Sequence, residues 1–305
     1  MVVERLKDLL PKKERGHDFY PSRKKLESAL EQSPHREDLI DYVVRHGGSV
    51  KKDLLRWPRS RGGQLTDVGI LRHMLAGNVR IEPFNIVQLQ PAGYDVRVSG
   101  RHLRMKSFDG LVSEGAIIPQ WSNDSPPIYD PYSQNYIGLV WAEVDPVSAA
   151  VIRTKIGWAR YVGVGSGGAY EKLDAFMHIK HEDELIFLQP GEMILAHTME
   201  EIGGSNVVTT MIAGKSTTGR HGFEVCSDAF LGDPGFSSRW VLEIANKHPD
   251  FAIYLARGTP VATVVFNELT EPPLQFYKGD YHGQGQEGDL RGLAPKPMRV
   301  IRSKD

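Results

Sequence analysis

Cysteine, net charge and long apolar runs are all scarce in this sequence of 305 residues, and each scarcity excludes a class of protein. Cys226 is the only cysteine, so the chain can form neither an internal disulfide nor a cysteine-rich zinc site. The formal net charge of -1 argues against a protein whose main task is to grip duplex DNA. No apolar run reaches the roughly 18 residues of a membrane span, and the charged N-terminus lacks the apolar core of a signal peptide. We therefore expect a cytoplasmic protein that does not bind membranes.

Residues 1–62 differ in composition and sequence pattern from the rest of the chain, and we expect them to form a basic helical extension. They carry 15 Lys and Arg residues against 10 Asp and Glu residues. Helical patterns cover Lys25–Leu30 and Asp38–Val44, and the glycines after the second pattern are typical of a helix C-terminus. The stretch from Tyr42 to Trp57 could also form a helix-turn-helix. Packing on the core or on a neighbouring subunit is the simpler interpretation, because the charge excess is small.

Residues 63–305 are expected to form a mainly β domain. Thr66 begins a helix as its N-cap, and Gly77 ends it. Short β-like runs then alternate with Gly and Pro turns, which is typical of a sandwich or barrel rather than of β-α-β units. The strand candidates are Ile86–Gln90, Tyr94–Val98, Glu184–Leu188, Met193–Ala196, Val207–Ile212, Trp240–Ala245, Ala252–Leu255 and Val261–Phe266. Residues 103–182, approximately, read as an insertion. Their glycine-rich run Gly163–Gly168 has no following Lys-Ser/Thr, so we expect a flexible loop there rather than a phosphate site.

A dense set of phosphate partners stands in the segment Gly214–Arg220, which reads GKSTTGR. Lys215 and Arg220 supply positive charge, and the hydroxyls between them supply directed hydrogen-bond donors. The segment is not a Walker loop, because the upstream glycine of that motif is missing at the required spacing. A polar turn at the start of a helix is the alternative interpretation, so this segment alone does not decide the function.

Two acidic residues follow this segment. Asp233 begins an Asp-Pro-Gly turn, where its carboxylate could accept a hydrogen bond from a sugar hydroxyl or could simply stabilise the turn. Glu243 stands in the apolar run Trp240–Ala245, which reads as a strand. If the strand alternates between a buried and a solvent face, the Glu243 carboxylate lies on the solvent face. The alternative is that the carboxylate is buried because it has a function there. A buried carboxylate would have a raised pKa, as suits a general base and proton shuttle.

Taken in order, these segments resemble the dCTP deaminase family, whose members are relatives of the trimeric dUTPases. That family carries a Gly-(Arg/Lys)-Ser-Ser-x-x-Arg loop, an Asp-Pro-Gly turn and a Leu-Glu strand. Four more segments resemble its opening helix, its first strand, its central strand pair and its nucleotide-covering C-terminal segment, namely Leu65–Leu71, Ile81–Arg97, Phe187–Leu195 and Tyr281–Gln284. The resemblance covers about 65–100 and about 183–290. It implies a dUTPase-like β-barrel or sandwich (β-clip) core.

The resemblance also implies roles for individual residues. Glu243 would be the catalytic group, with Ser216 near the reacting water and Arg220 orienting the carboxylate and the base. Asp233 would hold the deoxyribose 3'-hydroxyl, and Gln284 would close over the phosphates. The full set of implied nucleotide ligands is Lys215, Ser216, Thr217, Thr218, Arg220, Asp233, Val241, Leu242, Tyr277, Lys278, Tyr281 and Gln284. The family forms homotrimers with shared sites and takes its nucleotide as a magnesium complex, with no metal held by the protein.

The residues suit a deamination without zinc. Hydrolytic deamination adds water at cytosine C4 and delivers a proton to the departing amine. Zinc deaminases activate that water with a metal held by His-x-Glu and Pro-Cys-x-x-Cys motifs, which a chain with one cysteine cannot supply. His178 and His181 have no further ligands nearby and read as surface residues. A carboxylate must then move the proton, and Glu243 is the best candidate.

We therefore expect a dCTP deaminase that forms dUTP and ammonia. A bifunctional enzyme that also converts dUTP to dUMP, or a plain dUTPase, is the first alternative. A catalytically inactive nucleotide-binding regulator is the second. Three departures from the family pattern bear on the substrate. Asp280 stands where the family has a phosphate-binding lysine, which Lys278 could replace. Thr263 stands where the family has a glutamine, and either Phe276 or Tyr277 could cover the sugar.

Overall fold

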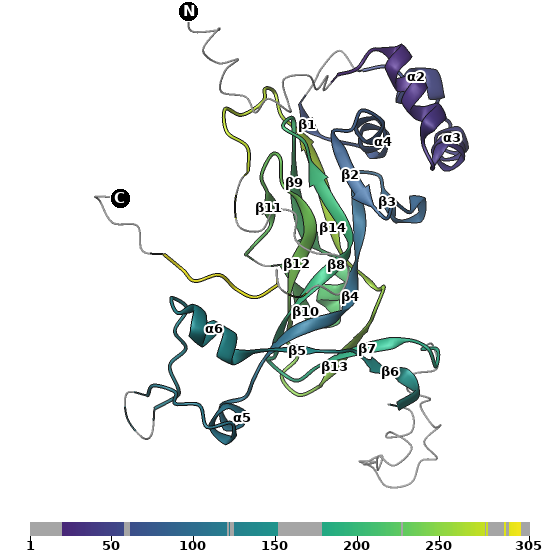
Figure 1. Cartoon of the computed structure of the whole chain (residues 1–305). Coiled ribbons are helices and arrows are strands. Elements are labelled where there is room, and N and C mark those ends of the chain that lie inside the picture. The colour runs from purple at the N-terminus through teal and green to yellow at the C-terminus, as the bar shows by residue number, and fades with distance from the viewer. Residues whose placement is uncertain are drawn as a thin grey trace, which may run out of the picture.

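The fold is mainly β, as the sequence predicts, and carries a helical layer at one end (Figure 1). The computed structural model describes residues 20–57, 62–120, 122, 125–151, 179–226, 228–277, 279, 290 and 293–299. An 11-stranded sheet has the main order β10-β12-β8-β4-β14-β9-β11, and a three-stranded sheet has the order β13-β7-β6. All strand pairs in both sheets are antiparallel. No helix within these residues is both long and apolar enough to cross a membrane.

The long strands of the large sheet carry most of the core. They are β4 (Gly93–Met105), β8 (Met193–Gly204), β9 (Val208–Gly214), β12 (Ser237–Asn246) and β14 (Pro260–Glu268). Shorter strands extend the two sheets: β1 (Gly63–Gln64), β2 (Val79–Glu82), β3 (Leu89–Gln90), β5 (Trp141–Val144), β6 (Val147–Ser148), β7 (Glu184–Leu188), β10 (Phe223–Val225), β11 (Leu231–Gly232) and β13 (Ile253–Ala256). One large apolar cluster joins residues from the strands and from the helical layer.

Seven of the eight strand candidates lie in strands, and one was assigned the wrong structure. The segment Ile86–Gln88 is a 3-10 helix, and only Leu89–Gln90 is extended. Asn85 explains the difference, because its side-chain oxygen accepts a hydrogen bond from the Val87 amide at 3.0 Å and so begins a helical turn. Apolar alternation alone does not reveal this side-chain cap.

The N-terminal helices form where the sequence predicts them. They are α2 (Arg23–Gln32) and α3 (Arg36–Arg45), and α4 (Asp67–Leu75) follows. Thr66 caps α4, because its hydroxyl accepts a hydrogen bond from the Gly69 amide at 3.3 Å. Gly77 ends α4 with a φ of 75°. A five-residue π-helix, Val50–Leu54, follows α3. It stands where a helix-turn-helix would have its second helix, the one that binds DNA.

The helical layer packs on the core of its own chain. Leu26, Leu39 and Leu54 are at most 2% exposed and belong to the same apolar cluster as the strands. The Tyr42 hydroxyl donates a hydrogen bond to Asp67 at 2.9 Å, which ties α3 to the start of α4. Trp57 meets His73 of α4 edge-on, with 5.0 Å between the ring centroids. Residues 20–57 are therefore an integral layer of the fold.

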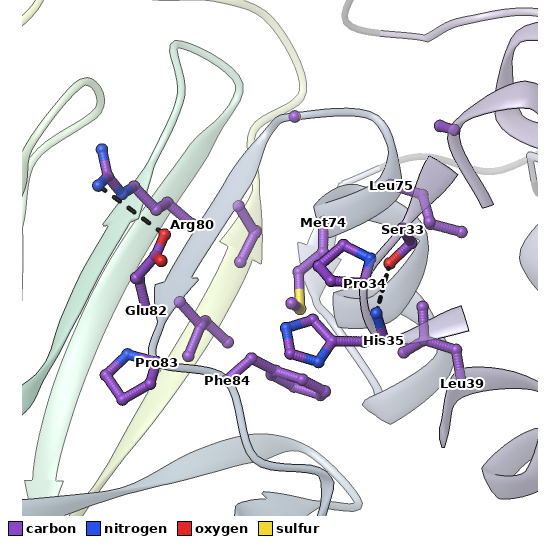
Figure 2. Close-up of a pocket in the computed structure, with 14 residues that line it drawn as sticks. Ser33, Pro34, His35, Leu39, Met74, Leu75, Arg80, Glu82, Pro83 and Phe84 are labelled. Atoms are coloured by element: carbon purple, nitrogen blue, oxygen red, sulfur yellow. Dashed lines mark hydrogen bonds and ion pairs between the residues drawn. The ribbon is translucent and has the colours of Figure 1, made fainter. Parts of the chain in front are cut away.

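A cavity of about 750 Å³ lies between this helical layer and β2 (Figure 2). His35, at the corner between α2 and α3, faces Phe84 with 5.1 Å between the ring centroids. Arg80 and Glu82 stand at the rim on β2 and form an ion pair at 4.0 Å. None of the site residues predicted from the sequence lines this cavity.

The insertion lies at the opposite end of the barrel from the helical layer (Figure 1). Its described part contains α5 (Phe108–Ser113) and α6 (Gln134–Val140), and β5 follows α6. β5 pairs with β4, where Trp141 stands opposite Met105. The insertion therefore contributes a strand to the large sheet and is not connected to it by loops alone.

We predict that the helical layer contributes directly to the stability of the barrel. Leu39→Ala removes a side chain that is 2% exposed and should lower the free energy of unfolding by about 2–5 kcal/mol. Val44→Ala, in the same helix at 60% exposure, is the matched control and should change it by less than about 0.5 kcal/mol. Urea unfolding followed by circular dichroism measures both. Equal losses in the two variants would contradict an integral layer.

Candidate functional site

Strand β12 positions Glu243 on the wall of a cavity. Burial alternates along this strand without a break, so that every second residue from Ser238 to Asn246 is buried. Leu242 is fully buried in the main core. Its neighbours Val241 and Glu243 lie on the other face and line the cavity. A ligand there meets their side chains, whereas the Leu242 side chain points away from it.

The cavity beside Glu243 has a volume of about 530 Å³, within the range of small-molecule sites. Three carboxylates line it: Glu243, Asp228 and Asp233. Asp233 precedes a turn in which the Phe236 amide donates to its carbonyl at 2.9 Å and Gly235 has a φ of 88°. This is the Asp-Pro-Gly turn expected from the sequence, and it holds the Asp233 carboxylate at the cavity.

Aromatic side chains form another part of the wall. The Phe236 ring meets Trp240 and Tyr277 edge-on, at centroid distances of 5.3 Å and 5.4 Å. Tyr277 lines the cavity, and its backbone amide donates to the Pro234 carbonyl at 3.0 Å. Phe276 instead approaches the turn at Gly235. Of the two aromatic candidates for covering a sugar, Tyr277 is therefore the one at the cavity.

The surroundings of Glu243 raise the pKa of its carboxyl. Burial raises the pKa of the Glu243 carboxyl, and the nearby negative charge of Asp228 raises it further. The backbone at Cys226 has a φ of 53° and donates its amide to the Glu243 carbonyl at 3.0 Å. This bond fixes the start of the segment that leads to Asp228. Burial raises the pKa of the Cys226 thiol to about 12, so this thiol stays protonated and is not a nucleophile.

The predicted phosphate segment lies at a different cavity. Lys215 precedes the short helix α8 (Ser216–Arg220) and forms an ion pair with the buried Asp95 on β4. The other oxygen of Asp95 accepts a hydrogen bond from the Thr263 hydroxyl at 2.6 Å. These contacts hold the start of the segment against the sheet. They also mean that Lys215 has a protein carboxylate as its partner in the single chain.

The remaining residues of the segment differ in their exposure. Ser216, Thr217 and Arg220 are exposed. Thr218 is buried, and its hydroxyl donates to the Val261 carbonyl at 3.3 Å. Lys215, Thr217 and Thr218 line a cavity of about 600 Å³ beside β13. The single chain therefore brings Glu243, Asp233, Val241 and Tyr277 together, and it places the phosphate segment elsewhere.

Several predicted residues lie outside the described residues: Lys278, Asp280, Tyr281, Gln284, His178 and the run Gly163–Gly168. His181, the other member of the histidine pair, is exposed in a turn. Within the described part of the chain, no group of three or more His, Cys, Asp and Glu side chains is arranged to hold a metal ion.

Sequence reasoning missed much of the wall of the Glu243 cavity, including Asp228. Three of the missed residues lie far from the motifs: Trp141 comes from the insertion, and Leu293 and Pro295 come from the segment after the predicted nucleotide-covering region. Leu293 is 2% exposed and packs with Leu103 and Leu195 in a small separate apolar cluster. No motif marks these residues, because their place depends on pairing between β5 and β4 and on the return of the C-terminal segment to the sheet.

Comparisons with known proteins found several similar proteins. Residues 151–269 match the family model described as "DCD: dCTP deaminase-like". The chain is 27% identical over 227 residues to a "dCTP deaminase, dUMP-forming" of Kocuria rhizophila, covering 73% of this chain and 91% of the relative. It is 29% identical to the protein of the same name from Clavibacter michiganensis subsp. michiganensis, covering 73% and 87%. A 2'-deoxycytidine 5'-triphosphate deaminase structure from Agrobacterium tumefaciens has a TM-score of 0.41 and 18% identity, covering 68% of this chain and 49% of that one.

We predict that Asp228 contributes to the raised pKa of Glu243. Asp228→Asn removes a negative charge beside the carboxyl and should lower its pKa, because the ionised form then meets less repulsion. Asp250→Asn, an exposed change away from the cavity, is the control and should leave the value in place. Titration of ¹³C-labelled glutamate carboxyls by NMR, with Glu243→Gln to assign the signal, measures the shift. An unchanged Glu243 pKa in Asp228→Asn would show that the two carboxyls do not interact.

Proposed function

Because this chain belongs to the dCTP deaminase family, we propose that it catalyses the hydrolytic deamination of dCTP. The observation that carries the proposal is the position of Glu243, a half-buried carboxyl with a raised pKa on the wall of a cavity of about 530 Å³. Asp233 and Tyr277, the residues expected at the sugar, line the same cavity. This combination suits a nucleoside bound with its base toward Glu243.

The proposed reaction uses Glu243 as a proton shuttle. Its carboxylate takes a proton from a water molecule as the water oxygen adds to C4 of cytosine. The protonated carboxyl then gives the proton to the exocyclic amine, the C4–N bond breaks and ammonia leaves, and the proton of the C4 hydroxyl moves to N3 as the C4 carbonyl forms. A raised pKa makes the carboxylate a stronger base, which suits both transfers. Since the carboxylate must be ionised to begin, activity should fall as the pH drops through the raised pKa.

We also propose that a complete site needs a second copy of the chain. Ser216 and Arg220, expected beside the reacting water, are exposed on α8, and none of the phosphate segment lines the Glu243 cavity. The family resemblance implies a homotrimer in which neighbouring subunits share a site, and such an arrangement supplies the missing groups. The triphosphate is proposed to arrive as its magnesium complex.

The names of the relatives favour a second step at the same site. Both curated relatives described above are named dUMP-forming. We therefore place the bifunctional alternative ahead of release of dUTP: after deamination, water attacks the α-phosphate of dUTP and pyrophosphate leaves. Purified protein with dCTP and magnesium separates the two outcomes. Ammonia with pyrophosphate and dUMP supports the second step, ammonia with dUTP supports deamination alone, and no ammonia contradicts the proposed function.

We predict that Glu243→Gln lowers the rate of ammonia release by about 10²- to 10⁴-fold, the usual contribution of a general acid-base group. The amide has a similar shape but accepts no proton from water, so binding of dCTP should persist. Glu224→Gln is the control: it makes the same chemical change on the neighbouring strand β10, where Glu224 pairs with Lys247. Deamination at the native rate by Glu243→Gln would overturn the mechanism.

The shared site gives a separate prediction. Glu243→Gln and Arg220→Ala should each be inactive when expressed alone. Co-expression should restore activity to about a quarter of native, because random assembly of a cyclic trimer leaves about that fraction of interfaces with both native residues. The measurement is ammonia release from the purified mixed oligomer. Activity no higher than that of either variant alone would place both residues in one subunit's site.

A further inference from the structure

Strand register places Trp141 on the same sheet face as Glu243, three strands away. Glu243 pairs with Leu195 on β8, and Leu195 pairs with Leu103 on β4. Directly paired residues of antiparallel strands point to the same face of a sheet. Met105 is two residues beyond Leu103 and therefore shares that face, as does its partner Trp141 on β5.

The same register fixes the approximate width of the site. Strands β12, β8, β4 and β5 lie side by side, and neighbouring strands are about 4.8 Å apart, so the backbones of β12 and β5 are separated by about 14 Å. Leu195 on β8 lines the cavity between them. Trp141 and Val241 both pack against the same small apolar cluster. Together with Leu195 they therefore line one apolar floor of the cavity, on which a planar ring can lie.

The indole of Trp141 reaches the cavity with its carbon atoms. Trp141 is half-buried and lines the cavity, whereas its Nε1 atom is covered by protein atoms. A ligand in the cavity therefore meets an apolar ring surface rather than the indole N–H. Aromatic side chains with such a surface are typical of the apolar walls of small-molecule sites.

We infer that Trp141 is a substrate-binding residue of the site, whose indole ring packs against the pyrimidine. The inference rests on the proposed function, since it takes the ligand to be a pyrimidine nucleotide. Cytosine and uracil are both planar rings, so one packing contact serves the substrate and the deaminated product. Trp141 lies in the insertion and outside residues 151–269, which the family model matches.

The direct test uses binding without turnover. Glu243→Gln protein labelled with 5-fluorotryptophan gives one ¹⁹F signal for each of its five tryptophans, and the spectrum of the same protein with Trp141→Phe assigns the Trp141 signal. Addition of dCTP should shift that signal and leave the Trp57 signal in place, because Trp57 belongs to the helical layer. A Trp141 signal that stays still at saturating dCTP would overturn the inference.

Steady-state kinetics separate a ligand contact from a structural role. Trp141→Ala removes the ring and should raise the KM for dCTP about threefold to tenfold with little change in kcat, as expected for one lost aromatic contact, whereas Trp141→Phe keeps a ring and should retain most of the affinity. Trp57→Ala is the matched control: it removes an indole whose N–H donates to the Pro21 carbonyl at 3.0 Å and should lower the Tm without changing the KM. A lowered Tm with an unchanged KM in both alanine variants would make Trp141 a structural residue only.

The outcomes keep the two proposals apart. A native enzyme that releases no ammonia contradicts the proposed function, whereas a shifted Trp141 signal still supports pyrimidine binding in the cavity. An active enzyme whose Trp141 signal and KM do not respond contradicts the inference alone. Should a Trp141 variant fail to fold, oxidation of Glu243→Gln protein by N-bromosuccinimide gives the decision. Peptide mass spectrometry should find Trp141 protected by dCTP and Trp57 unprotected, and equal oxidation with and without dCTP would overturn the inference.

Discussion

The pairing of β12 with β8 is the constraint on which the rest of the molecule depends. It aligns Leu242 and Ile244 with the core and leaves Val241 and Glu243 on the opposite face. A slip of one residue would exchange the two sets, burying a carboxylate in an apolar core and exposing two large aliphatic side chains. The energy that fixes this register is the burial of the core side chains. The position of the proposed catalytic carboxyl thus follows from packing.

The two ends of the proposed nucleotide site are built in different ways. The proposed base and sugar end is a cavity enclosed by strands, a turn and the returning C-terminal segment. The proposed phosphate end is an exposed short helix, tied to the sheet through Lys215, Asp95 and Thr263. The Thr263 hydroxyl, at the position where the family resemblance implies a glutamine, donates a hydrogen bond to Asp95. Because Asp95 is buried and holds Lys215, a triphosphate must either compete for that lysine or bind through Arg220 and the hydroxyls.

Much of the fold and half of the candidate site could be predicted from the sequence. Thr66, Gly77 and the Asp233 turn are local signals, and each formed the element expected of it. Glu243 remained ambiguous, because alternation permits either a solvent face or a buried one, and only the neighbouring strands show that its face lines a cavity. Trp141 could not be found at all. Its place depends on β5 pairing with β4, a contact between segments that no local pattern connects. The separation of α8 from the cavity is likewise set by the tertiary structure, which no local sequence pattern shows.

In the proposed complex the pyrimidine binds against Val241 and Trp141 with its C4 toward Glu243. A crystal structure of Glu243→Gln protein with dCTP and magnesium tests this most directly. We expect the cytosine ring in the cavity of about 530 Å³, the deoxyribose at Asp233 and Tyr277, and the triphosphate against α8 of a neighbouring copy. A nucleotide bound in the cavity beside β13 or beneath the helical layer, with the Glu243 cavity empty, would contradict the account.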